Sequence, residues 1–179
     1  MPAERFVQAL NDQIAREFTA SQQYLAVAVW FEDQTLPRLA QLFYDQSVEE
    51  REHALMMTKY LLDSEMRPAI PAVTAPKLEF ADFIEPIRVA LEQERKVTDQ
   101  IGELTGIARE ERDYVSDQFM QWFLKEQVEE VDLMSTLLHV AELSRERPLD
   151  LEDFIAREGI GGQGTADPTA PAIAGAAGA

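Results

Sequence analysis

Glu50 and His53 are three residues apart in the stretch VEEREHALMM, so a helix would present both side chains on one face. The rest of that face is mostly apolar, which makes a carboxylate and an imidazole there unusual. Three further segments with helical spacing each carry a glutamate near the middle of their apolar face: Glu17, Glu94 and Glu130. Carboxylates and one imidazole, without sulfur, are ligands suited to iron or manganese, with zinc as a competitor.

Four carboxylates cannot share a buried site as bare ions. Removing each from water costs several kcal/mol, and their mutual repulsion adds to that cost. Protonation or bound metal must compensate, and two divalent ions would balance four glutamates. We therefore predict a dinuclear iron site. Three polar residues one turn away are expected to hydrogen-bond to the ligands, namely Ser21, Gln46 and Thr98, and Gln127 is expected to lie beside the glutamates.

The elements that must position these residues follow from apolar seams with alternating three- and four-residue spacing. Pro37 is typical of a first helical position, Asp82 with Glu85 fits a capping box, and Asp113 or Ser116 would cap the next helix. Gly159 is a good residue to follow a helix end. The expected helices are 4–32, 37–64, 82–110, from about 113–116 to 144, and a short fifth at 149–158.

The connections predict how these helices pack. The first and third connections are short, so each joins an antiparallel pair. Residues 65–82 hold prolines 68, 71 and 76 and are long enough to run the length of a bundle. We therefore predict an all-α four-helix bundle with one long crossover plus a short fifth helix, in one domain over 1–158. Residues 159–179 are mostly Gly, Ala, Pro and Thr and are expected to be disordered.

Composition narrows the function classes. The net charge of −17 would repel nucleic acids and anionic membranes, so neither partner is expected. The absence of cysteine excludes disulfides and thiolate metal sites. The N-terminus has no pattern of a signal peptide, and the longest apolar run, YLAVAVWF, is too short to cross a bilayer. A cytoplasmic protein is expected.

Further residues beside the four glutamates have two interpretations each. Glu49, Glu126 and Glu129 form either a solvated acidic face or a third, weaker metal site. Tyr24 and Trp122 are either core aromatics or redox-active residues near the metals. The pattern of the residues leaves both questions open.

The same residues resemble the ferroxidase centre of bacterial non-haem ferritins, in particular the actinobacterial ones. The stretches EFTASQQYLA, EEREHA and QFMQWFLKEQVEE carry the resemblance, which covers about residues 5–158. The matching positions span four predicted helices, which makes the motif set specific. They are Glu17, Glu50-x-x-His53, Glu94 and Gln127-x-x-Glu130.

The resemblance implies a ferritin-like fold and assigns roles to the matching residues. One iron would bind to Glu17, Glu50 and His53, and a second to Glu50, Glu94 and Glu130, with Gln127 close by as a ligand or to position oxygen. A third iron site would use Glu49, Glu126, Glu129 and Glu130, and Tyr24 would be a nearby electron donor.

At the level of the whole protein, the resemblance implies a shell of 24 chains that stores iron. The site would oxidise Fe(II) to Fe(III) with O2 or H2O2, the product would be kept as a ferric mineral, and an unidentified reductase would release it. The fifth helix would line the four-fold axes. Haem is not expected, because Arg51 stands where haem-binding relatives have methionine and Gln127 replaces a glutamate of their second Glu-x-x-His motif.

Two other functions are compatible with the residue pattern. A di-iron oxygenase acting on an organic substrate would use the same ligands, and it would need an apolar pocket beside the metals and a reductase partner. A metal-free helical interaction bundle would be stabilised, without loss of activity, when Glu50 or Glu94 is replaced by alanine. Measuring whether the protein oxidises and stores iron distinguishes these two functions from that of a ferritin.

Overall fold

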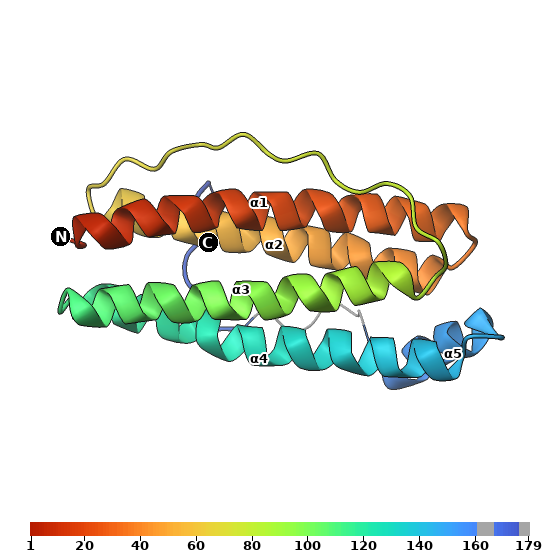
Figure 1. Cartoon of the computed structure of the whole chain (residues 1–179). Helices are drawn as coiled ribbons and strands as arrows, with labels where there is room; N and C mark the ends of the chain where they lie inside the picture. The colour runs from red at the N-terminus through yellow and green to blue at the C-terminus, as the bar shows by residue number, and fades with distance from the viewer. Residues whose placement is uncertain (161–166, 176–179) are drawn as a thin grey trace.

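The computed structural model describes residues 1–160 and 167–175, which form five helices without a strand (Figure 1). The prediction of an all-α fold with four long helices and a short fifth is confirmed. No helix in these ranges is both long and apolar enough to cross a membrane. The bounds are α1 Glu4–Asp33, α2 Pro37–Asp63, α3 Glu85–Glu110, α4 Tyr114–Leu143 and α5 Pro148–Glu158.

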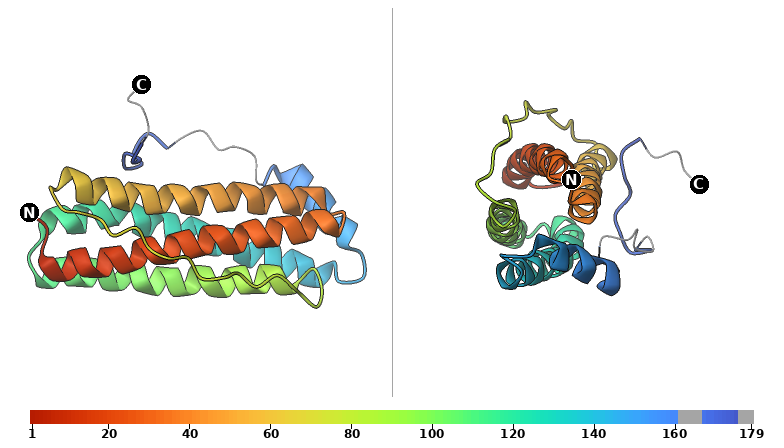
Figure 2. Two further views of the ribbon diagram at one scale, coloured as in Figure 1. Left: turned by 90° about the horizontal axis from the view of Figure 1, so that it is seen from above. Right: turned by 90° about the vertical axis from the view of Figure 1, so that its right-hand side faces the viewer.

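Two antiparallel hairpins, α1 with α2 and α3 with α4, make up the bundle (Figures 1 and 2). The crossover between α2 and α3 runs along the bundle from one end to the other (Figure 1). Hydrogen bonds from α1 side chains hold it. Gln23 donates to the carbonyl of Lys77 at 3.1 Å and accepts from its amide at 2.9 Å, and Asn11 accepts from the amide of Ala69 at 2.7 Å.

The core consists of two apolar clusters separated by a polar layer. On every long helix the apolar residues change from one cluster to the other at the position of the central glutamate. On α1, for example, Phe6 to Ile14 belong to one cluster and Tyr24 to Phe31 to the other, with Glu17 between them. Each buried large side chain contributes about 1.5–3 kcal/mol. The apolar clusters therefore stabilise the fold, whereas the buried polar layer between them destabilises it.

The predicted helix-end signals are confirmed, except that α3 starts later than expected. Asp113 caps α4 by accepting from the amide of Ser116 at 3.1 Å, and Gly159 follows α5 with a φ of 68°. The expected start of the third helix at Asp82 is three residues early. Asp82 accepts from the amide of Glu85 at 2.9 Å in a non-helical turn, so α3 begins only at Glu85.

An unforeseen long-range contact caps α2. Its N-cap residue, Leu36, offers no side-chain acceptor, and the buried carboxylate of Glu152 on α5 accepts from the amides of Arg38 and Leu39, both at 2.9 Å. We expect Glu152→Ala to lower the free energy of unfolding by about 2 kcal/mol, because two helix N–H groups lose a charged acceptor. Urea unfolding measures this, with the exposed neighbour Asp153→Ala as the control. An equal loss in both variants would contradict the capping role.

Residues 167–175 of the tail contact the bundle. Residues 167–175 lie across α2 and α4 (Figure 2): the amide of Ala174 donates to the carbonyl of Leu55 at 3.2 Å, and the indole of Trp122 donates to Asp167 at 3.1 Å. Ala170 and Ile173 pack against the apolar cluster there. The expectation of disorder also covers residues 161–166 and 176–179, which lie outside the described residues.

The contact with Trp122 gives the tail a spectroscopic test. Hydrogen bonds from Thr169 and Trp122 lower the pKa of Asp167 to about 2. The stability that the ionised carboxylate contributes is therefore present above its ordinary pKa of 3.8 and is lost as pH falls through about 2. In a Trp30→Phe background, we expect Asp167→Ala to move the Trp122 emission to longer wavelength at neutral pH. Asp167→Asn keeps an acceptor oxygen and should move it less. Identical spectra for all three proteins would contradict this contact.

Candidate metal centre

The polar layer brings three ligand groups from two helices together. Glu17 on α1 and Glu50 and His53 on α2 each offer one atom within 4.8 Å of the others. His53 Nδ1 lies 3.6 Å from Glu50 Oε2, and all three side chains are buried. Helical spacing explains the pair on α2, because residues three apart share a face. The antiparallel pairing of α1 with α2 places Glu17 opposite them.

Glu94, fully buried on α3, accepts hydrogen bonds from two other helices. Oε1 accepts from the hydroxyl of Tyr24, and Oε2 accepts from Nε2 of Gln127 at 3.2 Å. The hydroxyl of Thr98 donates to the backbone carbonyl of Glu94 at 2.8 Å. These contacts hold the carboxylate in one orientation and place Tyr24 directly against it.

Glu130 on α4 completes the layer. Its Oε1 receives a long contact of 3.4 Å from Nε2 of Gln46, which also donates to Glu49 at 2.8 Å. Gln46 therefore contacts a carboxylate of the layer as expected, and Gln127 lies beside Glu94. Thr98 does not reach a carboxylate, because its hydroxyl donates to the backbone carbonyl of Glu94. Ser21 does not either: its hydroxyl donates to the carbonyl of Ser47 at 2.6 Å, so it joins α1 to α2 and contacts no glutamate of the layer.

Three buried carboxylate oxygens have no hydrogen-bond partner among the described residues: Oε2 of Glu17, Oε2 of Glu50 and Oε2 of Glu130. Each belongs to a different helix, and a fourth unpartnered acceptor, Oε1 of Gln46, lies beside them. Buried acceptors without donors are costly, so they require a proton or a cation. The hard oxygen donors and one imidazole fit iron.

The environment favours protonation when no cation is bound. Burial raises the pKa of Glu50 and of Glu130 well above the ordinary value, and neighbouring carboxylates raise both further. Burial also raises the pKa of Glu94, to about 7, although hydrogen bonds from Tyr24 and Gln127 oppose the shift. Burial and the Glu94 carboxylate raise the pKa of Tyr24. A cation that binds here therefore competes with protons for these carboxylates.

A second group of ligands lies beside the first. Glu49, His53 and Glu126 each offer one atom within 4.8 Å of the others. Burial raises the pKa of Glu126 to about 7, with the carboxylate of Glu49 adding to the effect. Glu129 lies apart from this group, because its side chain is exposed and its carboxylate pairs with Lys125 at 3.3 Å. The structure therefore groups His53, rather than Glu129, with Glu49 and Glu126.

Two features of the site are absent from the sequence-based prediction. Gln13 is fully buried and donates to Oε1 of Glu17 at 2.8 Å, which leaves Oε2 free to face the ligand group. Its position four residues before Glu17 was the available signal. The ring of His53 is wedged against Trp122 and Phe123, with ring centroids 5.6 and 5.8 Å away, which restricts its rotation.

Comparison with known proteins agrees with this geometry. The family model for a ferritin-like domain matches residues 7–144. The chain is 50% identical over 157 residues to a protein from Mycobacterium tuberculosis named bacterioferritin BfrB, covering 88% of this chain and 87% of that protein. It is 35% identical over 145 residues to a bacterial non-heme ferritin from Staphylococcus aureus, covering 81% of this chain and 86% of that protein.

Solved structures show the same fold. An open-pore ferritin from the archaeon Archaeoglobus fulgidus superimposes with a TM-score of 0.82 at 30% identity, covering 87% of this chain and 94% of the other. A humanized archaeal ferritin gives a TM-score of 0.84 at 28% identity, covering 88% and 96%. By its sequence, its helices and its buried layer of carboxylates, this chain belongs to the ferritin family.

Proposed function

We propose that this protein oxidises Fe(II) to Fe(III) at an intrasubunit di-iron centre with O2 or H2O2, and stores the product as a ferric mineral in a shell of 24 chains. The observation that carries the proposal is the set of three unpartnered, buried carboxylate oxygens on three helices. In a metal-free bundle these oxygens would only destabilise the fold, because each is a buried acceptor without a donor.

In this proposal the first iron binds to Glu17, Glu50 and His53. The second binds to Glu94 and Glu130, with Glu50 shared between the two ions. Burial raises the pKa of Glu50, Glu94 and Glu130, so iron competes with protons for these carboxylates. Two Fe(II) ions give one electron each to O2, and two protons complete H2O2. The carboxylates then hold the more highly charged Fe(III) product.

Three neighbouring residues serve the centre in different ways. Gln127 keeps Glu94 oriented for the second iron and lies close enough to position the oxidant. Tyr24 is proposed as an electron donor, because its hydroxyl contacts Glu94 directly inside the core. Trp122 limits the rotation of the His53 ring. All three roles depend on the contacts that these side chains make with proposed iron ligands.

The proposed path of iron leads from the centre through the third site. Glu49 and Glu126 are partly exposed and share His53 with the first iron site, so they connect the core with one face of the bundle. Glu129, on the same face, would receive iron later. The proposal also includes a shell with α5 at its four-fold axes and a cytoplasmic location. It includes no haem, and a reductase would release the iron.

The test is to add Fe(II) to the purified protein in air and to separate the product by size, with iron analysis of each fraction. Storage predicts hundreds of iron ions per shell that elute with a very large particle. About two ions per chain on a small oligomer would instead favour a di-iron oxygenase. Loading that is equal in wild-type protein and in Glu50→Gln would show that the proposed centre is not used.

A further inference from the structure

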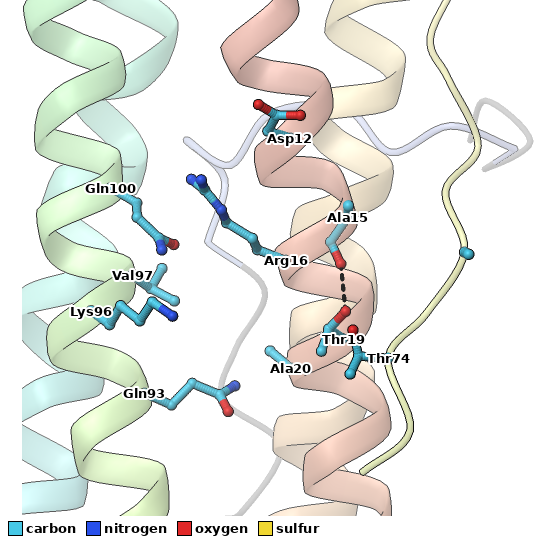
Figure 3. Close-up of a pocket in the computed structure, with 11 residues that line it drawn as sticks. Asp12, Ala15, Arg16, Thr19, Ala20, Thr74, Gln93, Lys96, Val97 and Gln100 are labelled. Atoms are coloured by element: carbon cyan, nitrogen blue, oxygen red, sulfur yellow. Dashed lines mark hydrogen bonds between the residues drawn. The ribbon is translucent and has the colours of Figure 1, made fainter.

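We propose that the groove between α1, α3 and the crossover binds a small oxyanion through Arg16, Lys96 and the amide of Gln93. The groove has a volume of about 440 Å³ and lies on the surface of the bundle (Figure 3). Neither the resemblance to ferritins nor the proposed iron chemistry assigns a role to it. The inference goes beyond the proposed function and does not rest on it.

Two cationic side chains share this groove, and neither forms an ion pair in the part of the chain that the structure describes. Arg16 extends from α1 and Lys96 from α3, both into the space between the helices (Figure 3). Within the described ranges, no carboxylate oxygen lies within 4.0 Å of either charged group. Asp12, the acid among the lining residues, lies at one end of the groove.

Such a pair is unusual in this chain. The sequence contains 33 Asp and Glu against 16 Lys and Arg. In the described part of the chain, nine of those 16 basic side chains lie within 4.0 Å of a carboxylate oxygen. In a chain with so many acids, two basic groups that point into one groove and remain free of them indicate a place for an anion.

Gln93 supplies an independent observation. Its Nε2 is buried, and no group in residues 1–160 or 167–175 accepts a hydrogen bond from it. A buried donor without an acceptor costs about 1–3 kcal/mol. Gln93 lines the groove one turn before Lys96, so its amide, the ammonium and the guanidinium adjoin one volume (Figure 3). An acceptor bound in the groove would give the amide of Gln93 the partner that it lacks.

The guanidinium is held ready for such a ligand. Nη1 of Arg16 donates to Oε1 of the buried Gln13 at 3.0 Å. This contact fixes one edge of the guanidinium and leaves its other N–H groups for the groove. A guanidinium pairs with two oxygens at once, and an ammonium contacts a third as a point charge. The donor set therefore selects an anion with several oxygens.

Phosphate and carboxylate anions share this chemistry. The groove falls within the usual size of small-molecule sites and exceeds what inorganic phosphate alone would fill. Part of its wall is apolar, with Ala15, Ala20 and Val97, and would accept a short carbon skeleton. Inorganic phosphate and citrate are therefore suitable probes, and comparing them distinguishes a free oxyanion from an organic acid.

The experiment is equilibrium dialysis of the iron-free protein against radiolabelled phosphate and, separately, labelled citrate, at constant ionic strength in chloride. We expect saturable binding of one anion per groove. Arg16→Gln with Lys96→Gln should weaken it at least about tenfold, because two charged donors are lost. Gln93→Leu should weaken it roughly tenfold without a change in net charge. Arg51→Gln with Arg95→Gln removes two exposed charges elsewhere and is the matched control.

The possible outcomes distinguish a specific anion-binding site from general electrostatic attraction. Binding of neither anion would overturn the proposal, as would an equal loss in the control pair. Unchanged binding in Gln93→Leu would leave only general electrostatic attraction and would also overturn it. Thermal unfolding of each variant verifies that the bundle is intact. Because no iron is present, the result is independent of whether the centre oxidises iron.

Discussion

Glu50→Gln is expected to lower the initial rate of Fe(II) oxidation by at least about 100-fold, because losing only a hydrogen-bond partner of a metal ligand already costs about 10- to 100-fold. Glu50 is the proposed shared ligand, so its loss affects both iron sites. An amide keeps the size of the side chain but cannot supply the negative charge that offsets two cations. The rate is measured by following the absorbance of Fe(III) after Fe(II) is mixed with aerobic protein.

The same variant should leave the iron-free fold intact. Burial raises the pKa of Glu50 well above its ordinary value, which favours the neutral form of the carboxyl, and the amide of glutamine resembles that form. We therefore expect the melting temperature of the iron-free protein to be unchanged. Glu103→Gln, on the exposed face of α3, is the control for the rate. A rate equal to wild type in Glu50→Gln would exclude the proposed shared ligand.

Glu94 is expected to make the stability of the iron-free protein depend on pH. Burial raises its pKa from 4.5 to about 7, so the folded state binds the proton more tightly than the unfolded chain does. The contribution of this proton to the free energy of unfolding is fully present below pH 4.5 and is lost as pH rises through about 7. Between pH 5 and pH 8 it amounts to about 2 to 3 kcal/mol.

A comparison with Glu94→Gln isolates this contribution. Urea unfolding of both proteins at pH 5, 6.5 and 8, without iron, gives the difference in free energy of unfolding at each pH. We expect wild type to lose stability relative to Glu94→Gln as pH rises, whereas Glu103→Gln should show no such trend. A difference that is constant over this range would mean that the carboxyl of Glu94 titrates normally.

The sequence specified the bundle because its signals are local. Apolar spacing over four long segments defines which face of each helix is buried, and two short connections with one long one define the hairpins and the crossover. Asp113 and Gly159 mark helix ends through contacts within a few residues. The layer of glutamates also follows, since positions near the middle of each helix meet at one level of an antiparallel bundle.

Details that depend on side-chain direction required the structure. Spacing alone groups Glu129 with Glu49 and Glu126, whereas the structure turns Glu129 to Lys125 and groups His53 with the other two. Rotation of a helix by part of a turn and the choice of rotamer decide between these arrangements, and neither is encoded in the spacing of residue types.

The sequence by itself determined the family, the fold class and the residue types at the buried layer. Only the tertiary structure decided which carboxylate oxygens lack partners, that Glu152 caps α2 and that Arg16 and Lys96 share a groove. The physical reason is distance along the chain. Helix periodicity acts over a few residues, whereas hydrogen bonds and burial at these positions join residues on different helices, which the packed bundle alone brings together.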